Sequence, residues 1–64
     1  MLDRKVERIN EGLMALLGSE ELVKRWWDSP NYAFGLRTPN EVWNESIDSH
    51  KEVIKYVLDA LSKP

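Results

Sequence analysis

The sequence predicts an all-α fold, a small bundle of four helices of which two are long and two are short. Apolar residues recur at helical spacing near both ends of the chain, and no stretch alternates with period two for long enough to form a strand. Two segments, Thr38-Pro39-Asn40-Glu41 and Ser49-His50-Lys51-Glu52, have the form of a capping box, which marks the start of a helix. At 64 residues the chain is expected to form one domain, residues 1–64.

The first long helix is expected over residues 2–17. Its apolar residues are spaced four, three, four and three apart, and they are Leu2, Val6, Ile9, Leu13 and Leu16. Leu17 lies beside this stripe and Met14 lies well off it, while Gly18 suits a left-handed helix end. The heptad spacing fits an internal core face, which the shortness of the run favours, or a homodimer seam formed by this helix.

A short second helix is expected to begin at Ser19, a plausible N-cap, and to end before Pro30. Glu21 and Arg25 would form an i,i+4 pair on its exposed side. Its apolar residues cover an arc of about 140°, with Val23 and Trp26 at the centre and Leu22 and Trp27 at the edges. We therefore expect Trp26 in the core and Trp27 half exposed.

A compact loop is expected from Asn31 to Arg37, with one helical turn at residues 32–34 and an unusual backbone angle at Gly35. Pro39 fits the first position of a short third helix, about residues 39–45. This helix would direct Val42 and Trp43 into the core.

The fourth helix is expected to begin at the Ser49 capping box. It carries an apolar stripe made of Val53, Ile54, Val57, Leu58 and Leu61. Tyr56 lies off that stripe. His50 is expected to be a surface residue, because a lone histidine without a cysteine or a suitably spaced carboxylate is a poor metal ligand.

The charge balance gives no sign of nucleic-acid binding. Nine basic and eleven acidic residues give a net charge of −2, without the concentrated basic face that nucleic acid requires. No apolar run approaches the ~20 residues of a membrane span. The segment MLDRKVERIN has charges where a signal peptide has its apolar stretch. The absence of cysteine fits a reducing compartment, so a cytoplasmic location is expected.

No group of residues has the pattern of a catalytic site. The serines are accounted for by caps, turns and the C-terminal end, and the carboxylates alternate with lysines and arginines as on solvated helix faces. Three glycines cannot form a phosphate-binding loop. We expect no catalytic residue, no metal and no cofactor, and the chain is not expected to be an enzyme.

Five of the six aromatic residues lie between residues 26 and 43. Trp26, Phe34 and Trp43 are expected to fill the core, since each such ring buries about 150–250 Å². Trp27 and Tyr32 suit either the core or a contact surface. A contact surface is the functional alternative because Trp, Tyr and Arg are the usual hot-spot residues of protein interfaces.

Several short motifs in this segment resemble the toxin-binding C-terminal domain of the MbcA/ParS/Xre antitoxins. They are Leu16-Leu17-Gly18, Trp26-Trp27, Ser29-Pro30-Asn31, Ala33-Phe34-Gly35 and Arg37-Thr38-Pro39-Asn40-Glu41-Val42. Trp26 matches the family tryptophan, and Pro30 and Asn31 match its Pro-Asn pair. Thr38, Pro39 and Glu41 match its capping box. The resemblance covers residues 13–61, and Leu36 stands where the family usually has a second glycine. A loop of different shape is expected there, because a bulky side chain is excluded from some conformations open to glycine.

The resemblance implies an antitoxin module that binds a RES-type toxin, which consumes NAD, and obstructs its active-site cleft. Exposure and residue type point to one contact surface, with Arg37 as its anchor, made of Trp27, Asn31, Tyr32, Leu36, Arg37 and Asn40. Only one helix precedes Gly18, so autorepression through a helix-turn-helix domain is not expected of this chain.

Two alternatives stay open at this point. A self-associating helical module could use the heptad stripe of residues 2–17 as a dimer seam. A DNA-binding accessory domain would need a basic face. Lys24, Arg25 and Arg37 are too few and too interleaved with acids to provide one.

Overall fold

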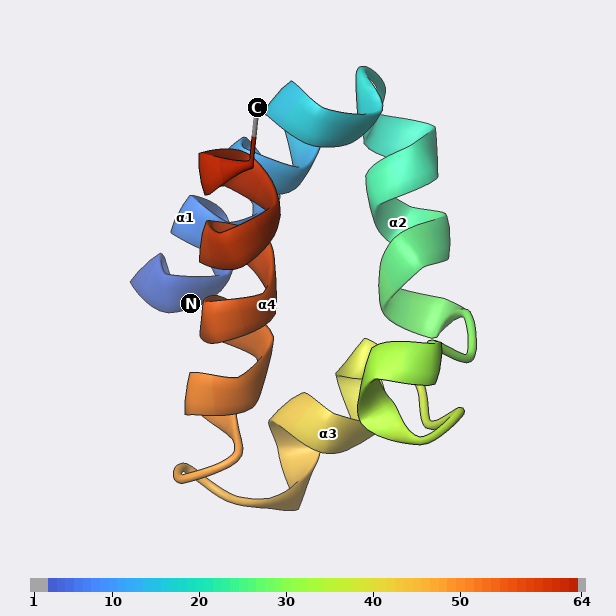
Figure 1. Ribbon diagram of the computed structural model, residues 1–64, viewed down its shortest axis with the longest axis vertical. Coiled ribbons are helices and arrows are strands. Elements are labelled where there is room, and N and C mark those ends of the chain that lie inside the picture. The colour runs from blue at the N-terminus through green and yellow to red at the C-terminus, as the bar shows by residue number, and fades with distance from the viewer. Residues whose placement is uncertain (1–2, 64) are drawn as a thin grey trace.

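The computed structural model describes residues 3–63, which form four α-helices, one 3₁₀ turn and no strand (Figure 1). The elements are α1 (Arg4–Leu17), α2 (Glu20–Asp28), η1 (Tyr32–Phe34), α3 (Pro39–Glu45) and α4 (His50–Ser62). The expected all-α fold, with two long helices and two short ones, is confirmed.

Local capping residues set the limits of α1 and α2. Gly18 adopts φ +87° and its N–H donates to the Met14 carbonyl, so the expected glycine end of α1 is confirmed. The Ser19 hydroxyl accepts a hydrogen bond from the Leu22 N–H at 3.2 Å, which confirms the N-cap of α2. At the start of α1 the Asp3 carboxylate caps the Lys5 N–H. Leu2, the first residue of the expected stripe, lies outside the described residues.

The helices are arranged around a single core. α1 packs against α2 and α4, and α3 packs against the same two helices from the other end, as Figure 1 shows. The buried apolar residues come from all four helices: Ile9, Leu13, Val23, Val42, Trp43, Val53 and Val57.

The stripe of α1 faces this core. Ile9 and Leu13 are 5% and 1% exposed, which supports the internal use of the heptad stripe. Leu17 packs against the core in place of Leu16, which is 41% exposed. The expectation for Leu16 was therefore wrong, whereas Met14 is exposed as predicted.

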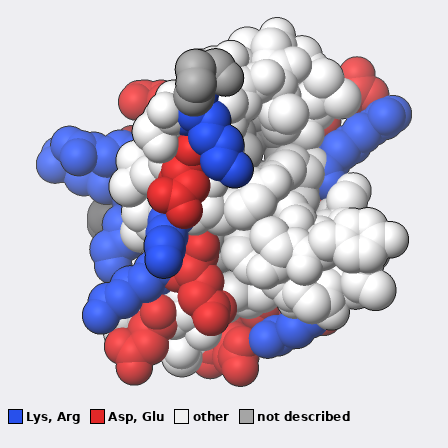
Figure 2. Space-filling model, viewed as in Figure 1, with Lys and Arg blue, Asp and Glu red and all other residues white. Residues whose placement is uncertain are grey.

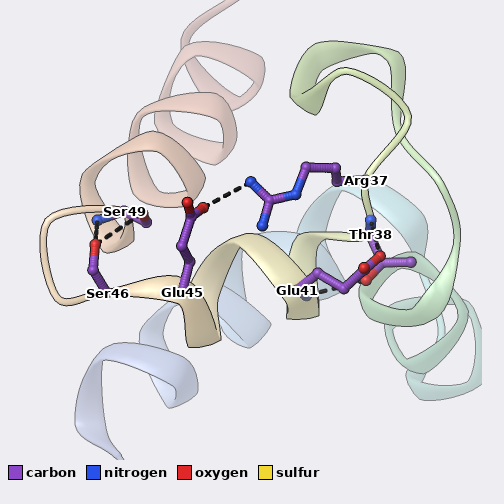
Figure 3. A network of polar contacts seen from close by, with 6 residues as sticks. All are labelled: Arg37, Thr38, Glu41, Glu45, Ser46 and Ser49. Atoms are coloured by element: carbon purple, nitrogen blue, oxygen red, sulfur yellow. Dashed lines mark hydrogen bonds and ion pairs between the residues drawn. The ribbon is translucent and has the colours of Figure 1, made fainter.

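The start of α3 has the predicted capping box. The Glu41 N–H donates to the Thr38 hydroxyl at 3.1 Å, and the Thr38 N–H donates to the Glu41 carboxylate at 3.0 Å (Figure 3). The hydrogen bond from the Thr38 amide lowers the pKa of Glu41. Pro39 occupies the first helical turn, where its missing N–H leaves no broken hydrogen bond.

The start of α4 differs from the prediction. Ser49 has helical backbone angles and its side chain makes no cap hydrogen bond, so the second capping box is wrong. The capping geometry occurs three residues earlier, where Ser46 is extended and its hydroxyl accepts from the Ser49 N–H at 3.2 Å (Figure 3). A turn at residues 47–49 leads from there into the helix.

The buried face of α4 is also rotated from the predicted one. Val53 and Val57 are buried as expected, but Leu58 and Leu61 are 59% and 42% exposed. Tyr56, expected off the stripe, packs against the core instead. The reason is that α4 packs against both α1 and α3, and Tyr56 faces Trp26 of α2 and Phe34 of η1.

Candidate functional site

Aromatic rings form a continuous series through the molecule. Trp26 contacts Trp27, Phe34 and Tyr56 at centroid distances of 5.2, 6.5 and 5.9 Å. Trp27 contacts Trp43 edge to face at 5.9 Å. These contacts link α2, η1, α3 and α4, so the rings hold the loop between α2 and α3 in place.

Trp43, rather than Trp26, is the buried tryptophan. It is 8% exposed, while Trp26 and Trp27 are half-buried at the edge of the core. The expectation for Trp27 is confirmed, and the expectation that Trp26 would be the core tryptophan was wrong. The indole N–H of Trp27 donates to the Asn10 side chain at 2.7 Å, which ties α2 to α1.

His50 is not a free surface residue. Its ring stacks on Trp43 with centroids 3.6 Å apart and planes inclined by 7°. The residue is half-buried, and its Nδ1 is buried without a hydrogen-bond partner. The surface prediction failed because the sequence gives no sign that α3 would place Trp43 beneath the first turn of α4.

Tyr32 is the one aromatic residue outside this series of rings. It is 89% exposed, the highest value among the large hydrophobic residues that the structure describes. Leu36, on the other side of the same turn, is 56% exposed. We call Tyr32 and Leu36 the loop tip. Both are among the predicted contact residues, and their role as contacts stays a prediction.

The loop that carries this tip is held by backbone hydrogen bonds. An isolated antiparallel bridge pairs Asn31 with Arg37, whose carbonyl accepts from the Asn31 N–H at 3.1 Å. The Leu36 N–H donates back to the Asn31 carbonyl at 2.9 Å, and the Asn31 side chain accepts from the Ala33 N–H. The predicted helical turn at residues 32–34 is confirmed. Asn31 is therefore committed to shaping the loop.

Leu36 adopts an uncommon backbone conformation. Its φ is +67°, next to Gly35 at +64°, and it is the one described non-glycine residue with positive φ. The bulky side chain thus does not keep position 36 out of the left-handed region. That region costs an L-residue other than glycine or asparagine roughly 1–2 kcal/mol, and such strain is found where function requires a particular backbone.

Arg37 has a partner within the chain. Its guanidinium donates to the Glu45 carboxylate at 2.7 Å, which joins the end of the loop to the last residue of α3 (Figure 3). This hydrogen bond and the charge of Glu45 raise the pKa of Arg37. Both side chains remain about half exposed. Arg37 therefore positions the loop, in addition to offering a charge at its edge.

The six predicted contact residues lie in separate places. Trp27 and Asn40 line a hollow of about 320 Å³ between α1, α2 and α3. Arg37 lines a different hollow, of about 410 Å³, between the loop and α4. The two hollows share no lining residue. The Asn40 side chain already has a hydrogen-bond partner within the chain, since its amide donates to the Asp28 carboxylate at 3.3 Å.

The hollow beside Arg37 has an aromatic floor and a charged rim. Phe34 and Tyr56 form the aromatic part, with ring centroids 5.5 Å apart, and the rim is Arg37, Glu52, Lys55 and Asp59. Figure 2 shows an uncharged surface between the charged side chains of α4 and the region of α2. Tyr56 and Glu45 are the residues that sequence reasoning missed here. A helical wheel of α4 gives no signal for Tyr56, since its burial depends on Trp26 and Phe34.

Comparison with known proteins adds no relative to this description. The chain matches no family model, no curated protein and no solved structure. Among residues 3–63 there is no helix long and apolar enough to cross a membrane. The same part of the chain contains no group of three or more potential metal ligands.

Proposed function

We propose that this chain is a protein-binding module of the antitoxin type, which binds a RES-type toxin and covers its NAD-consuming active site. The observation that carries the proposal is the loop tip. Tyr32 is 89% exposed and Leu36 is 56% exposed on a strained backbone, while every other aromatic ring contributes to the core or its edge. Tyrosine is one of the residue types in which binding hot spots are enriched.

The rigidity of the loop supports this proposal. A tip that is already ordered loses less conformational entropy on binding than a flexible segment of the same composition. The Asn31–Arg37 bridge, the Asn31 side chain and the Arg37–Glu45 pair all act on the backbone that carries the tip. The resemblance of residues 13–61 to the antitoxin domain is the reason for proposing a RES-type toxin as the partner.

Occlusion requires no chemistry from this chain. The module would act stoichiometrically, as a plug over the toxin's cleft, and it is not an enzyme in this proposal. Its place of action would be the cytoplasm, where a toxin of this class finds NAD. The role of Arg37 would be double, because it holds the loop through Glu45 and also lies at the rim of the hollow beside the tip.

The test is a titration of the chain against a purified RES-type toxin from the same organism, with NAD consumption as the readout. Inhibition is expected to be complete near equimolar chain. Tyr32→Ala and Leu36→Ser should each weaken inhibition about tenfold or more, the loss of a hot-spot contact of at least about 1.4 kcal/mol. Their helical circular dichroism should stay unchanged.

Leu58→Ser is the matched control, because Leu58 is as exposed as Leu36 but lies on α4. It should inhibit like the wild-type chain. No inhibition at tenfold molar excess, or equal inhibition by Tyr32→Ala and the wild type, would rule out the proposed mode of binding.

A further inference from the structure

A second groove lies between α1 and α4, on a different side of α4 from the hollow beside Arg37. It has a volume of about 330 Å³ and is lined by Lys5, Arg8, Ile9, Ile54, Val57, Leu58 and Leu61. Its floor is aliphatic, and its two remaining residues are cations from α1. No carboxylate lines it.

The exposed leucines of α4 belong to this groove. Leu58 and Leu61 are 59% and 42% exposed, although the sequence predicted both in the core. The two helices come close together at Gly12, where an added Cβ would lie 2.9 Å from the Leu61 Cδ1 and 3.1 Å from the Val57 Cγ1. A concave aliphatic surface between two neighbouring helices suits an added amphipathic helix.

Charge on α1 is divided between its two sides. Lys5 and Arg8 line the groove beside α4, whereas Glu7 and Glu11 line the hollow beside α2. Within residues 3–63 the ion pairs are Arg25–Glu21 and Arg37–Glu45, so neither cation of the groove is paired. In Figure 2 basic side chains project from the left edge, where α1 and α4 lie in Figure 1, and acidic side chains lie among them. A protein with net charge −2 thus has a locally positive groove.

We infer that this groove binds an acidic amphipathic helix of a partner protein. The apolar side of that helix would cover Leu58 and Leu61, and carboxylates along its edge would pair with Lys5 and Arg8. Charge complementarity selects the acidic helix, since a basic one would meet two cations without a compensating carboxylate in the groove.

A second copy of the chain fits this groove less well. In an isologous dimer the same patch forms both sides of the interface, so the two grooves would bring together four cations and no carboxylate. An anionic lipid surface shares the required chemistry, but a membrane calls for protruding apolar residues rather than a groove between helices.

The inference goes beyond the proposed function. The groove and the loop tip share no residue, so the chain would have separate sites for two different partners. Its test uses a probe without any toxin, so either proposal can fail alone.

The probe is a fluorescein-labelled synthetic helix with leucine at positions i, i+3, i+4 and i+7 and glutamate on both flanks. Binding to the full chain is followed by fluorescence anisotropy, and a second peptide carries lysine in place of glutamate. The glutamate peptide should bind at least about tenfold more tightly than the lysine peptide, and its binding should weaken as salt is added.

Two double variants of equal net charge locate the site. Lys5→Glu with Arg8→Glu, and Lys24→Glu with Arg25→Glu, each change the charge from −2 by −4 to −6. The first pair should weaken binding of the glutamate peptide about tenfold, and the second should change it less than about twofold. Leu58→Ser should also weaken it, without a change in helical circular dichroism.

Four outcomes would overturn the inference. One is the absence of binding by the glutamate peptide, and another is equal binding of both peptides. A third is binding to vesicles of anionic phospholipid that outcompetes the peptide, which would assign the groove to lipid. A fourth is a dimer seen by sedimentation and lost in Leu58→Ser, which would assign it to a second copy.

Discussion

At the scale of single residues, Leu36 shows how local strain and exposure coincide. Its backbone lies in the left-handed region while its side chain is 56% exposed, so little packing offsets the strain at this residue. The cost is met by the surrounding hydrogen bonds, above all the Leu36 N–H to the Asn31 carbonyl. At position 36, leucine would therefore favour the proposed contact with a partner, whereas a residue that tolerates positive φ would make the free chain more stable.

Leu36→Asn is expected to stabilise the chain by about 0.5–1 kcal/mol, because asparagine tolerates positive φ and little buried area is lost. Urea denaturation followed by circular dichroism measures this change. The matched control is Leu58→Asn, at 59% exposure but inside a helix, which should destabilise by a few tenths of a kcal/mol through lower helix propensity. Destabilisation by Leu36→Asn would mean that the leucine side chain has a packing role.

At the scale of elements, the short α3 depends on its capping box for its start, while α4 begins through the turn that follows Ser46. In both cases a hydroxyl satisfies a backbone N–H that the helix itself leaves unpaired. Only the first contains a carboxylate, Glu41, and its pKa is lowered by the hydrogen bond from the Thr38 amide. Lowering the pH should therefore destabilise the start of α3 through protonation of Glu41.

The pH dependence has a definite sign. Because the pKa of Glu41 is lower in the folded chain, its contribution to stability is present above its ordinary value of 4.5 and is lost as the pH falls through the lowered value. Urea midpoints measured from about pH 6 to about pH 3 should fall less in Glu41→Gln than in the wild type. Glu11→Gln removes an equal charge from an exposed site on α1 and should keep the wild-type profile. Identical profiles for Glu41→Gln and the wild type would contradict this account.

The shifted start of α4 can be tested with two serines. Ser46→Ala should cost about 1 kcal/mol, as the loss of a capping hydroxyl does, and lower the Tm by roughly 4–8 °C. Ser49→Ala should cost less, because the Ser49 hydroxyl contacts only Ser46. The capping box predicted from the sequence requires the reverse order, so thermal unfolding of both variants decides between them.

At the scale of the whole molecule, the rings that join α2, η1, α3 and α4 concentrate much of the packing in one region. Trp43 is central to it, in contact with Trp27 on one side and with His50 on the other. A chain of this length has roughly 3–10 kcal/mol of stability, at about 0.05–0.15 kcal/mol per residue. The burial of one large aromatic ring therefore contributes a considerable part of that stability.

Trp43→Ala is expected to cost about 3–5 kcal/mol, which is a large part or all of that stability. Tyr32→Ala removes a ring of comparable size and should change the free energy of unfolding by less than about 0.5 kcal/mol, since Tyr32 is 89% exposed. Circular dichroism during urea denaturation measures both. A similar loss for the two variants would show that the exposed tyrosine contributes to the fold.

The sequence correctly predicted three helix limits that depend on contacts between neighbouring residues. Gly18, Ser19 and the Thr38 box define helix limits through contacts within a few residues, and all three were read correctly. Apart from the Ser49 capping box, whose role falls to Ser46, the errors concern contacts between distant elements. Tyr56 is half-buried because Trp26 and Phe34 face it, and His50 is half-buried because Trp43 lies beneath it.

The candidate site was predictable in the same limited way. Residue type and loop position identified Tyr32 and Leu36, because neither has a helix face to bury. The Glu45 partner of Arg37 could not be predicted, since it lies eight residues away at the end of α3. The role of Arg37 as the anchor of a contact surface stays a prediction. The groove between α1 and α4 was not predicted, because the whole apolar stripe of α4 was expected to be buried. The core covers only part of that stripe and leaves Leu58 and Leu61 exposed.

The packing of α1 against α4 bears on how the chain is made. During synthesis α1, α2 and α3 leave the ribosome before α4, yet Val53 and Val57 of α4 are among the most buried residues of the core. The first three helices therefore cannot bury Ile9 and Leu13 in the native way until α4 has emerged. Folding of this domain is accordingly expected to follow translation of residue 62 rather than to accompany it, and the nascent chain exposes its hydrophobic stripe to chaperones in the interval.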